Sequence, residues 1–220
     1  MVVVIQNDPL VPPGLISAYL DALGLEWRCC RADRNENIPE ADAVIILGGT
    51  MGVDDEREFP YLRQVKTHID RWLEQELPML GICLGGQLLA QAGGGEVRSA
   101  SHGEHGVVLV EQTESGRADP LFCGLPERMP VFQWHNDSFL VPPKGKHLST
   151  SPSCPAQAFR LGNAWGLQFH PEVDYAIVKR WGDLLPGAEP YIQQFLSCAD
   201  EITDLTQKLL GNFLAMVSAR

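Results

Sequence analysis

The first 95 residues alternate between short apolar runs and segments with helical spacing, and this alternation limits the possible folds more than any other feature. Residues 1–6 form a β-branched run that stops at Asn7-Asp8-Pro9, which is typical of a strand buried on both faces of a parallel sheet. The other strand-like runs are 25–30, 43–47 and 79–82, and the helical patterns are 14–23, 61–73 and 84–92. The alternation predicts a doubly wound α/β fold with a mostly parallel central sheet flanked by helices.

Shorter strand-like runs with Pro- and Gly-rich connections follow from residue 96 onward. They cover residues 107–111, 131–134, 156–160 and 165–169. We expect them to form antiparallel strands at one edge of the sheet. Residues 191–216 carry apolar side chains at three- and four-residue spacing, which predicts one helix or two packed on the sheet. No repeat or linker divides the sequence, so we expect a single domain over residues 1–220, with a catalytic core of about 1–183 and a helical tail of about 187–217.

The charge balance and the cysteine pattern exclude several classes of protein. Seventeen Lys and Arg stand against 28 Asp and Glu, a net charge of −11 without a basic block, so we expect no nucleic-acid partner. The apolar runs are far shorter than the roughly 20 residues of a membrane-spanning helix, so we expect no membrane association. Six cysteines without a C-x-x-C pair predict reduced thiols in the cytoplasm. A cysteine in a special backbone setting is then a candidate nucleophile.

Cys83 lies in such a setting. In Gly81-Ile-Cys83-Leu-Gly85, a strand ends, a nucleophilic side chain follows between two glycines, and a helix begins at once. This pattern is a nucleophile elbow with Cys in the place of Ser, and the positive end of the helix dipole favours the thiolate. The motif alone is equally compatible with a small buried side chain at the end of a core strand.

A second motif, Gln168-Phe-His170-Pro-Glu172, follows an alternating run. The strand delivers His170 at its end, and Pro171 imposes a turn that lets Glu172 return to the imidazole. His170 is then the candidate general base and acid for Cys83, with Glu172 fixing its tautomer. The alternative is a core histidine beside a capping glutamate.

Gly48-Gly49 interrupts the run 43–47 and forms the third motif. Backbone N–H groups of Gly49 and of Leu84, the residue after the candidate nucleophile, can stabilise a tetrahedral oxyanion. A double glycine is also an ordinary turn. Because sites in such sheets lie beyond the carboxyl ends of the strands, all three motifs are expected to meet at one edge.

His102-Gly-Glu104-His105 carries metal-capable side chains, but a third ligand at a familiar spacing is lacking. We therefore expect no metal site and no cofactor.

The three motifs together, in this order, resemble the class I (triad-type) glutamine amidotransferases over about residues 1–183. Within that family the chain is most similar to the glutaminase domain of GMP synthase and to its free-standing relatives. The resemblance implies that Cys83 attacks the side-chain amide of glutamine, that ammonia leaves with a proton from His170, and that Glu172 completes the triad. Water then releases glutamate from a γ-glutamyl thioester. The N–H groups of Gly49 and Leu84 would stabilise the oxyanion.

The same resemblance implies a substrate-binding set. Gln87 would contact the glutamine, and the backbone of the segment containing Trp134, His135 and Asn136 would hold its α-amino and α-carboxyl groups. The family often has Gly after this His, whereas this chain has Asn136. The substrate is thus expected to be glutamine or another small γ-glutamyl compound.

Class I amidotransferases normally pass ammonia to a synthetase, and the sequence contains no G-x-x-x-x-G-K-[ST] nucleotide loop. Two hypotheses keep the triad: a separate synthetase subunit receives the ammonia, or the chain is a free-standing hydrolase of a γ-glutamyl peptide or small amide. A third hypothesis is a catalytically silent regulatory subunit of a synthetase.

Overall fold

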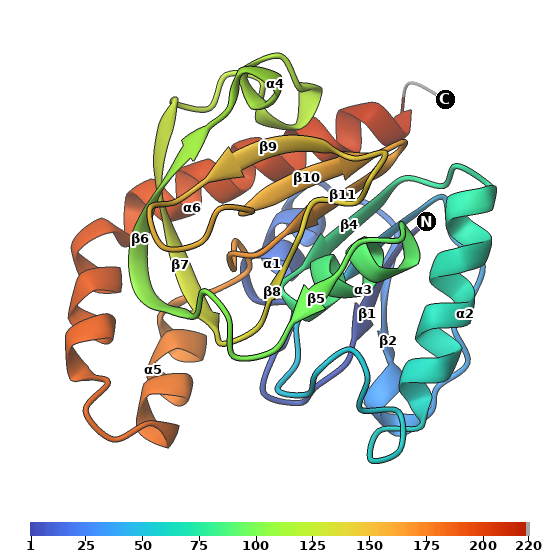
Figure 1. Cartoon of the computed structure of the whole chain (residues 1–220), viewed down its shortest axis with the longest axis horizontal. Helices are drawn as coiled ribbons and strands as arrows, with labels where there is room; N and C mark the ends of the chain where they lie inside the picture. The colour runs from blue at the N-terminus through green and yellow to red at the C-terminus, as the bar shows by residue number, and fades with distance from the viewer. Residues whose placement is uncertain (219–220) are drawn as a thin grey trace.

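The computed structural model describes residues 1–218, in which nine strands form one sheet with helices on both faces (Figure 1). The strand order is β2-β1-β3-β4-β11-β10-β9-β6-β7, and a separate two-stranded sheet pairs β5 with β8. The strands are β1 Val2–Gln6, β2 Trp27–Arg31, β3 Ala43–Ile46, β4 Met79–Ile82, β5 Val97–Arg98, β6 Glu104–Gln112, β7 Arg128–His135, β8 Ser138–Phe139, β9 Lys146–Thr150, β10 Ala158–Leu161 and β11 Ala164–Leu167. The predicted α/β fold class is confirmed.

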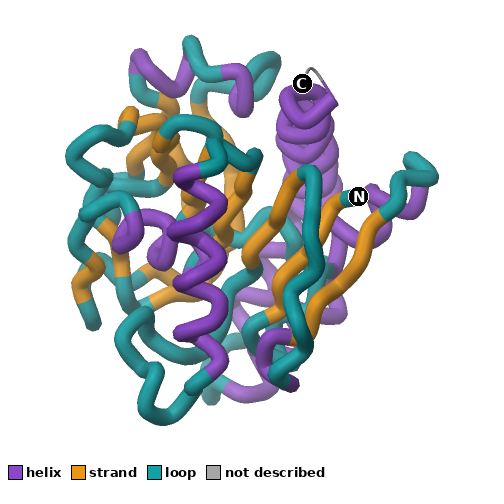
Figure 2. Tube along the Cα trace, turned by 90° about the vertical axis from the view of Figure 1, so that its right-hand side faces the viewer, coloured by secondary structure: helices purple, strands orange, loops and turns teal. Residues whose placement is uncertain are grey.

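Helices cover both faces of the sheet, as the fully buried first strand predicted. They are α1 Gly14–Ala22, α2 Tyr61–Glu74, α3 Leu84–Ala92, α4 Glu114–Arg117, α5 Tyr175–Leu184 and α6 Glu189–Ser218, with short 3₁₀ turns η1 Ala32–Arg34 and η2 Pro120–Phe122. Alternate residues of β1 enter two separate cores: Val2 and Val4 pack with α1, α5 and α6, whereas Val3 and Ile5 pack with α2 and α3. In the turned view of Figure 2, helices lie on both sides of the strands.

The prediction that residues 165–169 form an antiparallel edge strand is wrong. β11 lies in the middle of the sheet and runs parallel to β4, with Gly166 opposite Gly81. The tight hairpin from β10 turns the chain back into the direction of β4. Since β4 and β11 end side by side, the residues that follow β11 arrive next to Cys83, and this topology creates the site.

The strands β10, β9, β6 and β7 confirm the predicted antiparallel part of the sheet. The tail is a helical run, α6, interrupted at Cys198, whose φ of −139° is not helical, so it is two helices joined by a kink. Phe195, Ile202, Leu209 and Phe213 bury its inner face against the sheet. Strands β5, β8 and β9 and helix α5 were not predicted. Within residues 1–218, no helix combines the length and the apolar character needed to cross a membrane.

Candidate active site

Cys83 occupies a strained turn between β4 and α3. Its backbone has φ 49° and ψ −109°, a conformation that a residue with a Cβ rarely adopts. Its N–H donates to the Leu167 carbonyl at 2.8 Å, and its carbonyl accepts from the Gln87 N–H at 2.9 Å. The turn is therefore held by β11 on one side and by the first turn of α3 on the other, as the elbow motif predicted.

Three glycines allow α3 to begin in contact with the strands. A Cβ on Gly85 would lie 2.1 Å from the Ile46 carbonyl oxygen, one on Gly81 would lie 2.5 Å from the Gly85 oxygen, and one on Gly86 would lie 2.6 Å from the Leu167 oxygen. These distances leave no space for a methyl group against rigid backbone. Glycine is thus required here to bring the helix N-terminus to Cys83.

The substitution Gly85→Ala is expected to lower the free energy of unfolding by about 1–3 kcal/mol, because the added methyl overpacks the contact with β3. Urea unfolding followed by circular dichroism measures this loss. Gly94→Ala is the matched control, since nothing lies within 4 Å of its added Cβ and the positive φ of 78° is its only cost. Gly85→Ala should also impair turnover, whereas the control should not; equal stability and equal activity for the two variants would refute the packing argument.

His170 and Glu172 form a buried pair behind the cavity. The ring Nδ1 lies 2.7 Å from Glu172 Oε1, and the two residues are 2% and 0% exposed. Burial alone would lower the pKa of His170, but the charges of Glu172 and Cys83 raise it to about 10. His170 is therefore an imidazolium at neutral pH, and such a cation next to a thiol favours the thiolate.

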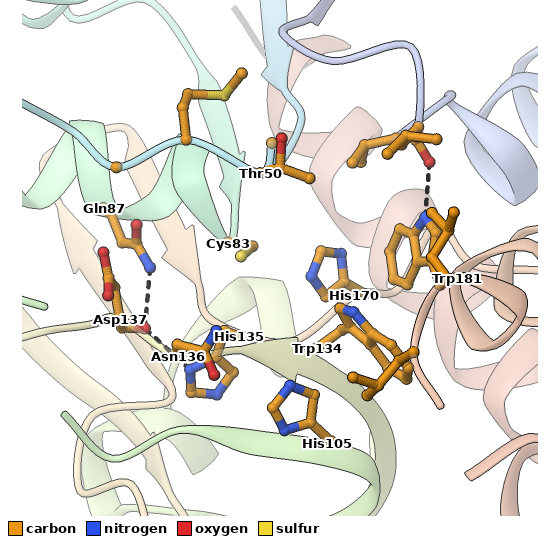
Figure 3. A pocket seen from close by; sticks show the side chains of 17 residues that line it. Thr50, Cys83, Gln87, His105, Trp134, His135, Asn136, Asp137, His170 and Trp181 are labelled. Carbon is orange, nitrogen blue, oxygen red and sulfur yellow. Dashed lines mark hydrogen bonds between the residues drawn. The ribbon is translucent and has the colours of Figure 1, made fainter. Parts of the chain in front are cut away.

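The imidazole reaches Cys83 across Gly48. A Cβ on Gly48 would lie 3.2 Å from His170 Cε1 and 3.5 Å from Cys83 Cβ, so this glycine backbone is packed against both side chains. His170 Nε2 is buried without a hydrogen-bond partner among the described residues. Figure 3 shows the ring beside the sulfur at the same cavity. A nitrogen in this position is free to exchange a proton with a bound substrate.

The loop after β3 is held in place by the end of β1. Asp8 accepts from the N–H of Thr50 at 3.0 Å and from its hydroxyl at 2.5 Å. The neighbouring Gly49 packs against Leu84, since a Cβ there would lie 2.9 Å from Leu84 Cδ2. The Leu84 N–H is the first of α3, where a helix leaves its amides without internal partners. The two predicted oxyanion donors thus belong to neighbouring segments.

A chain of amides links Cys83 to the far wall of the cavity. Gln168 Nε2 donates to Cys83 Sγ at 3.7 Å, and Gln87 Nε2 lies 3.5 Å from Gln168 Oε1. Gln87 also donates to the Asp137 carbonyl at 3.1 Å. An amide that donates to the sulfur stabilises a thiolate, so Gln168 is part of the site although it received no role from the sequence.

The cavity beside Cys83 has a volume of about 410 Å³, within the range of small-molecule sites. It brings together most of the residues that the sequence singled out: Gly49, Cys83, Gln87, Trp134, His135, Asn136 and His170. Glu172 lies behind His170 rather than in the wall. The wall also contains Trp181, His105 and Asp137, to which the sequence analysis gave no role.

His135 and Glu104 belong to a buried hydrogen-bond network beneath the substrate segment. Glu104 accepts from the Ser151 hydroxyl at 2.6 Å, from Gln157 Nε2 at 2.5 Å and from Ser153. His135 Nδ1 lies 2.9 Å from the Asp137 carbonyl, and its Nε2 lies 3.4 Å from Glu104. The network fixes the end of β7, where the substrate segment begins.

Glu104, His135 and Cys154 bring three ligand-type atoms within 4.8 Å of one another. These donors do not fit a metal ion. The Glu104 oxygens already accept hydrogen bonds, and burial raises the pKa of the Cys154 thiol to about 11, which opposes the thiolate that a metal requires.

The substitution Glu104→Gln is expected to lower the free energy of unfolding at pH 7 by about 1–3 kcal/mol. Burial alone would raise the pKa of Glu104, but hydrogen bonds led by those of His135 and Ser151 hold it below the usual 4.5. Its stabilising contribution is therefore present above about pH 4.5 and is lost as the pH falls through the lower folded-state value. Urea unfolding at pH 7 and pH 3 measures both effects.

The matched control is Glu111→Gln, which removes an exposed carboxylate paired with Arg128. A surface pair contributes only about 0–1 kcal/mol, so the control should stay close to the wild type. If the two variants lose equal stability at pH 7, Glu104 does not organise this wall.

Two of the missed residues differ in the signal that the sequence offered. Asp8 follows the first predicted strand directly, and the carboxyl end of a central strand is where site residues gather, so its role was within reach of the sequence. Trp181 lies on α5, which was not predicted, and reaches the cavity only through tertiary packing.

Comparison with known proteins identifies the family. The sequence model described as "Glutamine amidotransferase class-I" matches residues 14–177. The chain belongs to the class I glutamine amidotransferase family, as the three motifs predicted, and the expectation of an enzyme of this class is confirmed at that level.

Among curated proteins, the chain is 34% identical over 165 residues to a protein of Sulfolobus acidocaldarius that is named as one subunit of a glutamine-hydrolysing GMP synthase, covering 73% of this chain and 84% of that protein. It is 38% identical over 140 residues to "GMP synthase [glutamine-hydrolyzing]" of Geobacillus kaustophilus, covering 62% of this chain and 26% of that protein. The chain thus matches about a quarter of the length of the second relative.

Among solved structures, a glutamine amidotransferase from Thermotoga maritima superimposes with a TM-score of 0.88 at 28% identity, covering 96% of both chains. A glutamine amido transferase from Methylobacillus flagellatus gives a TM-score of 0.86 at 25% identity, covering 97% of this chain and 94% of that one. The predicted fold is confirmed by both.

Proposed function

We propose that this chain hydrolyses the side-chain amide of glutamine through a Cys83–His170–Glu172 triad and delivers the ammonia to a separate synthetase subunit. One observation carries the proposal: a strained cysteine at a helix N-terminus meets an imidazolium fixed by a buried carboxylate, at a cavity with a polar wall. These are the groups that nucleophilic amide hydrolysis requires.

Each group has a role in the reaction. The Cys83 thiolate attacks the amide carbon, and the N–H groups of Gly49 and Leu84 stabilise the oxyanion. His170 gives its proton to the departing nitrogen, which leaves as ammonia. A water then attacks the γ-glutamyl thioester with His170 as general base, and glutamate is released. Glu172 holds the ring orientation and its positive charge through both steps.

The α-amino and α-carboxyl groups of glutamine occupy the wall formed by Gln87 and by the segment after β7. Gln87 and Asp137 are joined by a hydrogen bond and both line the cavity, which supports this placement. The Asp137 carboxylate complements the α-ammonium group, and backbone N–H groups near Trp134, His135 and Asn136 complement the α-carboxylate.

The likeness to a protein named as one subunit of a GMP synthase supports a separate synthetase partner. We further propose that residues 1–220 act as one amidotransferase domain, with a catalytic core of about 1–183 and α6 as a tail that packs on the sheet. A catalytic thiolate works under reducing conditions, which supports the cytoplasm as its location.

The direct test is glutamate release from glutamine by the isolated chain at neutral pH. We expect turnover that depends on Cys83 and survives Cys154→Ala, which removes another buried thiol. A chain that hydrolyses γ-glutamyl amides but leaves glutamine untouched would favour the second candidate, a free-standing γ-glutamyl hydrolase. That candidate is favoured by one observation, the aromatic wall on one side of Cys83.

A further inference from the structure

The cavity at Cys83 has two chemically different ends (Figure 3). Gln87 and Asp137 form a polar end on one side of the sulfur. The other side, which we call the aromatic end, is formed by His105, Trp134, Trp181, Leu184 and Leu185. A substrate that reaches Cys83 therefore meets polar groups in one direction and apolar rings in the other.

The chemistry decides which part of the substrate meets the aromatic end. The nitrogen that leaves must face His170, because the imidazolium protonates it. The His170 ring packs edge-on against Trp181, with the centroids 4.9 Å apart. Any group attached to the leaving nitrogen is therefore directed along Trp181, while the α-amino and α-carboxyl groups stay at the polar end.

The rings of the aromatic end form a continuous and preformed wall. Trp181 lies 6.0 Å from Trp134, and Trp134 lies 5.2 Å from His105, which in turn stacks on Tyr191 at 6.0 Å. Trp181 Nε1 donates to the Leu10 carbonyl at 2.7 Å, which fixes its orientation. Such a wall loses little freedom when a further ring packs against it.

The wall is apolar and carries no charge at neutral pH. Burial lowers the pKa of His105, and the nearby His135 lowers it further, so the imidazole is neutral. Leu184 is 62% and Leu185 39% exposed, which leaves apolar surface at the mouth in contact with water. The single leaving nitrogen of glutamine covers none of this surface, whereas an aromatic substituent on that nitrogen covers it and gains the apolar contact.

We propose that the aromatic end is a subsite for the leaving amine and that the site hydrolyses γ-glutamyl amides whose nitrogen carries an aromatic group. The proposal rests on the proposed function, since it uses the same Cys83 chemistry. The carbon–sulfur bond forms as the carbon–nitrogen bond breaks, the amine leaves with the proton of His170, and water cleaves the thioester. A γ-glutamyl amide and water thus give glutamate and a free amine, without any redox partner.

The test compares γ-glutamylbenzylamide, γ-glutamylmethylamide and glutamine with the full chain. One apolar group in a matching pocket changes kcat/KM by about 10–200-fold, so we expect benzylamide to exceed methylamide by at least about 10-fold. The double variant Leu184→Ser, Leu185→Ser should reduce this ratio several-fold. Leu196→Ser is the matched control, because Leu196 is 47% exposed on α6 and lies outside the cavity wall; it should keep the wild-type ratio.

The outcomes separate this inference from the proposed function. A benzylamide-to-methylamide ratio of one or less, together with good glutamine turnover, overturns the subsite and leaves the triad chemistry standing. A high ratio that the double variant does not change overturns the placement of the subsite. If none of the three compounds releases glutamate, both proposals fall.

Discussion

Cys83→Ala is expected to lower kcat for glutamine hydrolysis by at least about 10⁴-fold, because no other group can form the thioester. Alanine retains the Cβ and therefore the same backbone strain at φ 49°, so the fold should persist. Glutamine binding should also persist, since the polar wall is unchanged. Glutamate release measures the first effect, and isothermal titration with glutamine measures the second.

The control for this experiment is Cys154→Ala, which removes a buried thiol outside the cavity wall. It should retain kcat within a few-fold of the wild type. Loss of activity in both variants would indicate a general dependence on packing, and retained turnover in Cys83→Ala would remove Cys83 from the chemistry.

Glu172→Gln should reduce kcat by about 10³–10⁴-fold with little change in KM. The amide keeps the shape of the carboxyl group but not its charge, so the His170 imidazolium loses its partner. Against the effect of burial, the Glu172 and Cys83 charges hold the pKa of His170 at about 10, so the alkaline loss of kcat/KM in the wild type should lie near that value. In the variant this loss should move to lower pH.

The same pKa fixes the sign of a stability effect. Because the pKa of His170 is raised from 6.5 to about 10, its contribution to the unfolding free energy is fully present below about pH 6.5. The contribution is lost as the pH rises through about 10. Glu127→Gln, an exposed carboxylate paired with Arg117, is the matched control and should leave the pH profile unchanged. An unaltered alkaline limb in Glu172→Gln would contradict the role given to the buried pair.

The N-terminal half of the fold could be predicted from the sequence because its strands are buried on both faces and its helices have strong apolar periodicity. The range predicted for the first of these helices, 14–23, exceeds α1 by one residue, and β4 and α3 match their predicted bounds. The orientation of β11 could not be predicted, since alternating residues look the same in parallel and antiparallel strands. Direction depended on the hairpin with β10, a tertiary feature.

The candidate site shows the same division. Cys83, His170 and Gly49 follow strand ends in recognisable motifs, so their meeting could be predicted. The aromatic end could not, because Trp181, Trp134 and His105 come from α5, β7 and β6 and share no spacing in the sequence. Gln168 stood within a quoted motif, but only its contact with the sulfur gives it a role.

A glutamine-like chloroketone, followed by intact-mass measurement and peptide mapping, tests the identity of the nucleophile. The thiolate at Cys83 should take up one equivalent of label, glutamine should protect it, and the other five cysteines should stay unmodified. Label distributed over several cysteines, or full glutamine turnover after one equivalent has bound elsewhere, would contradict the assignment of Cys83 as the nucleophile.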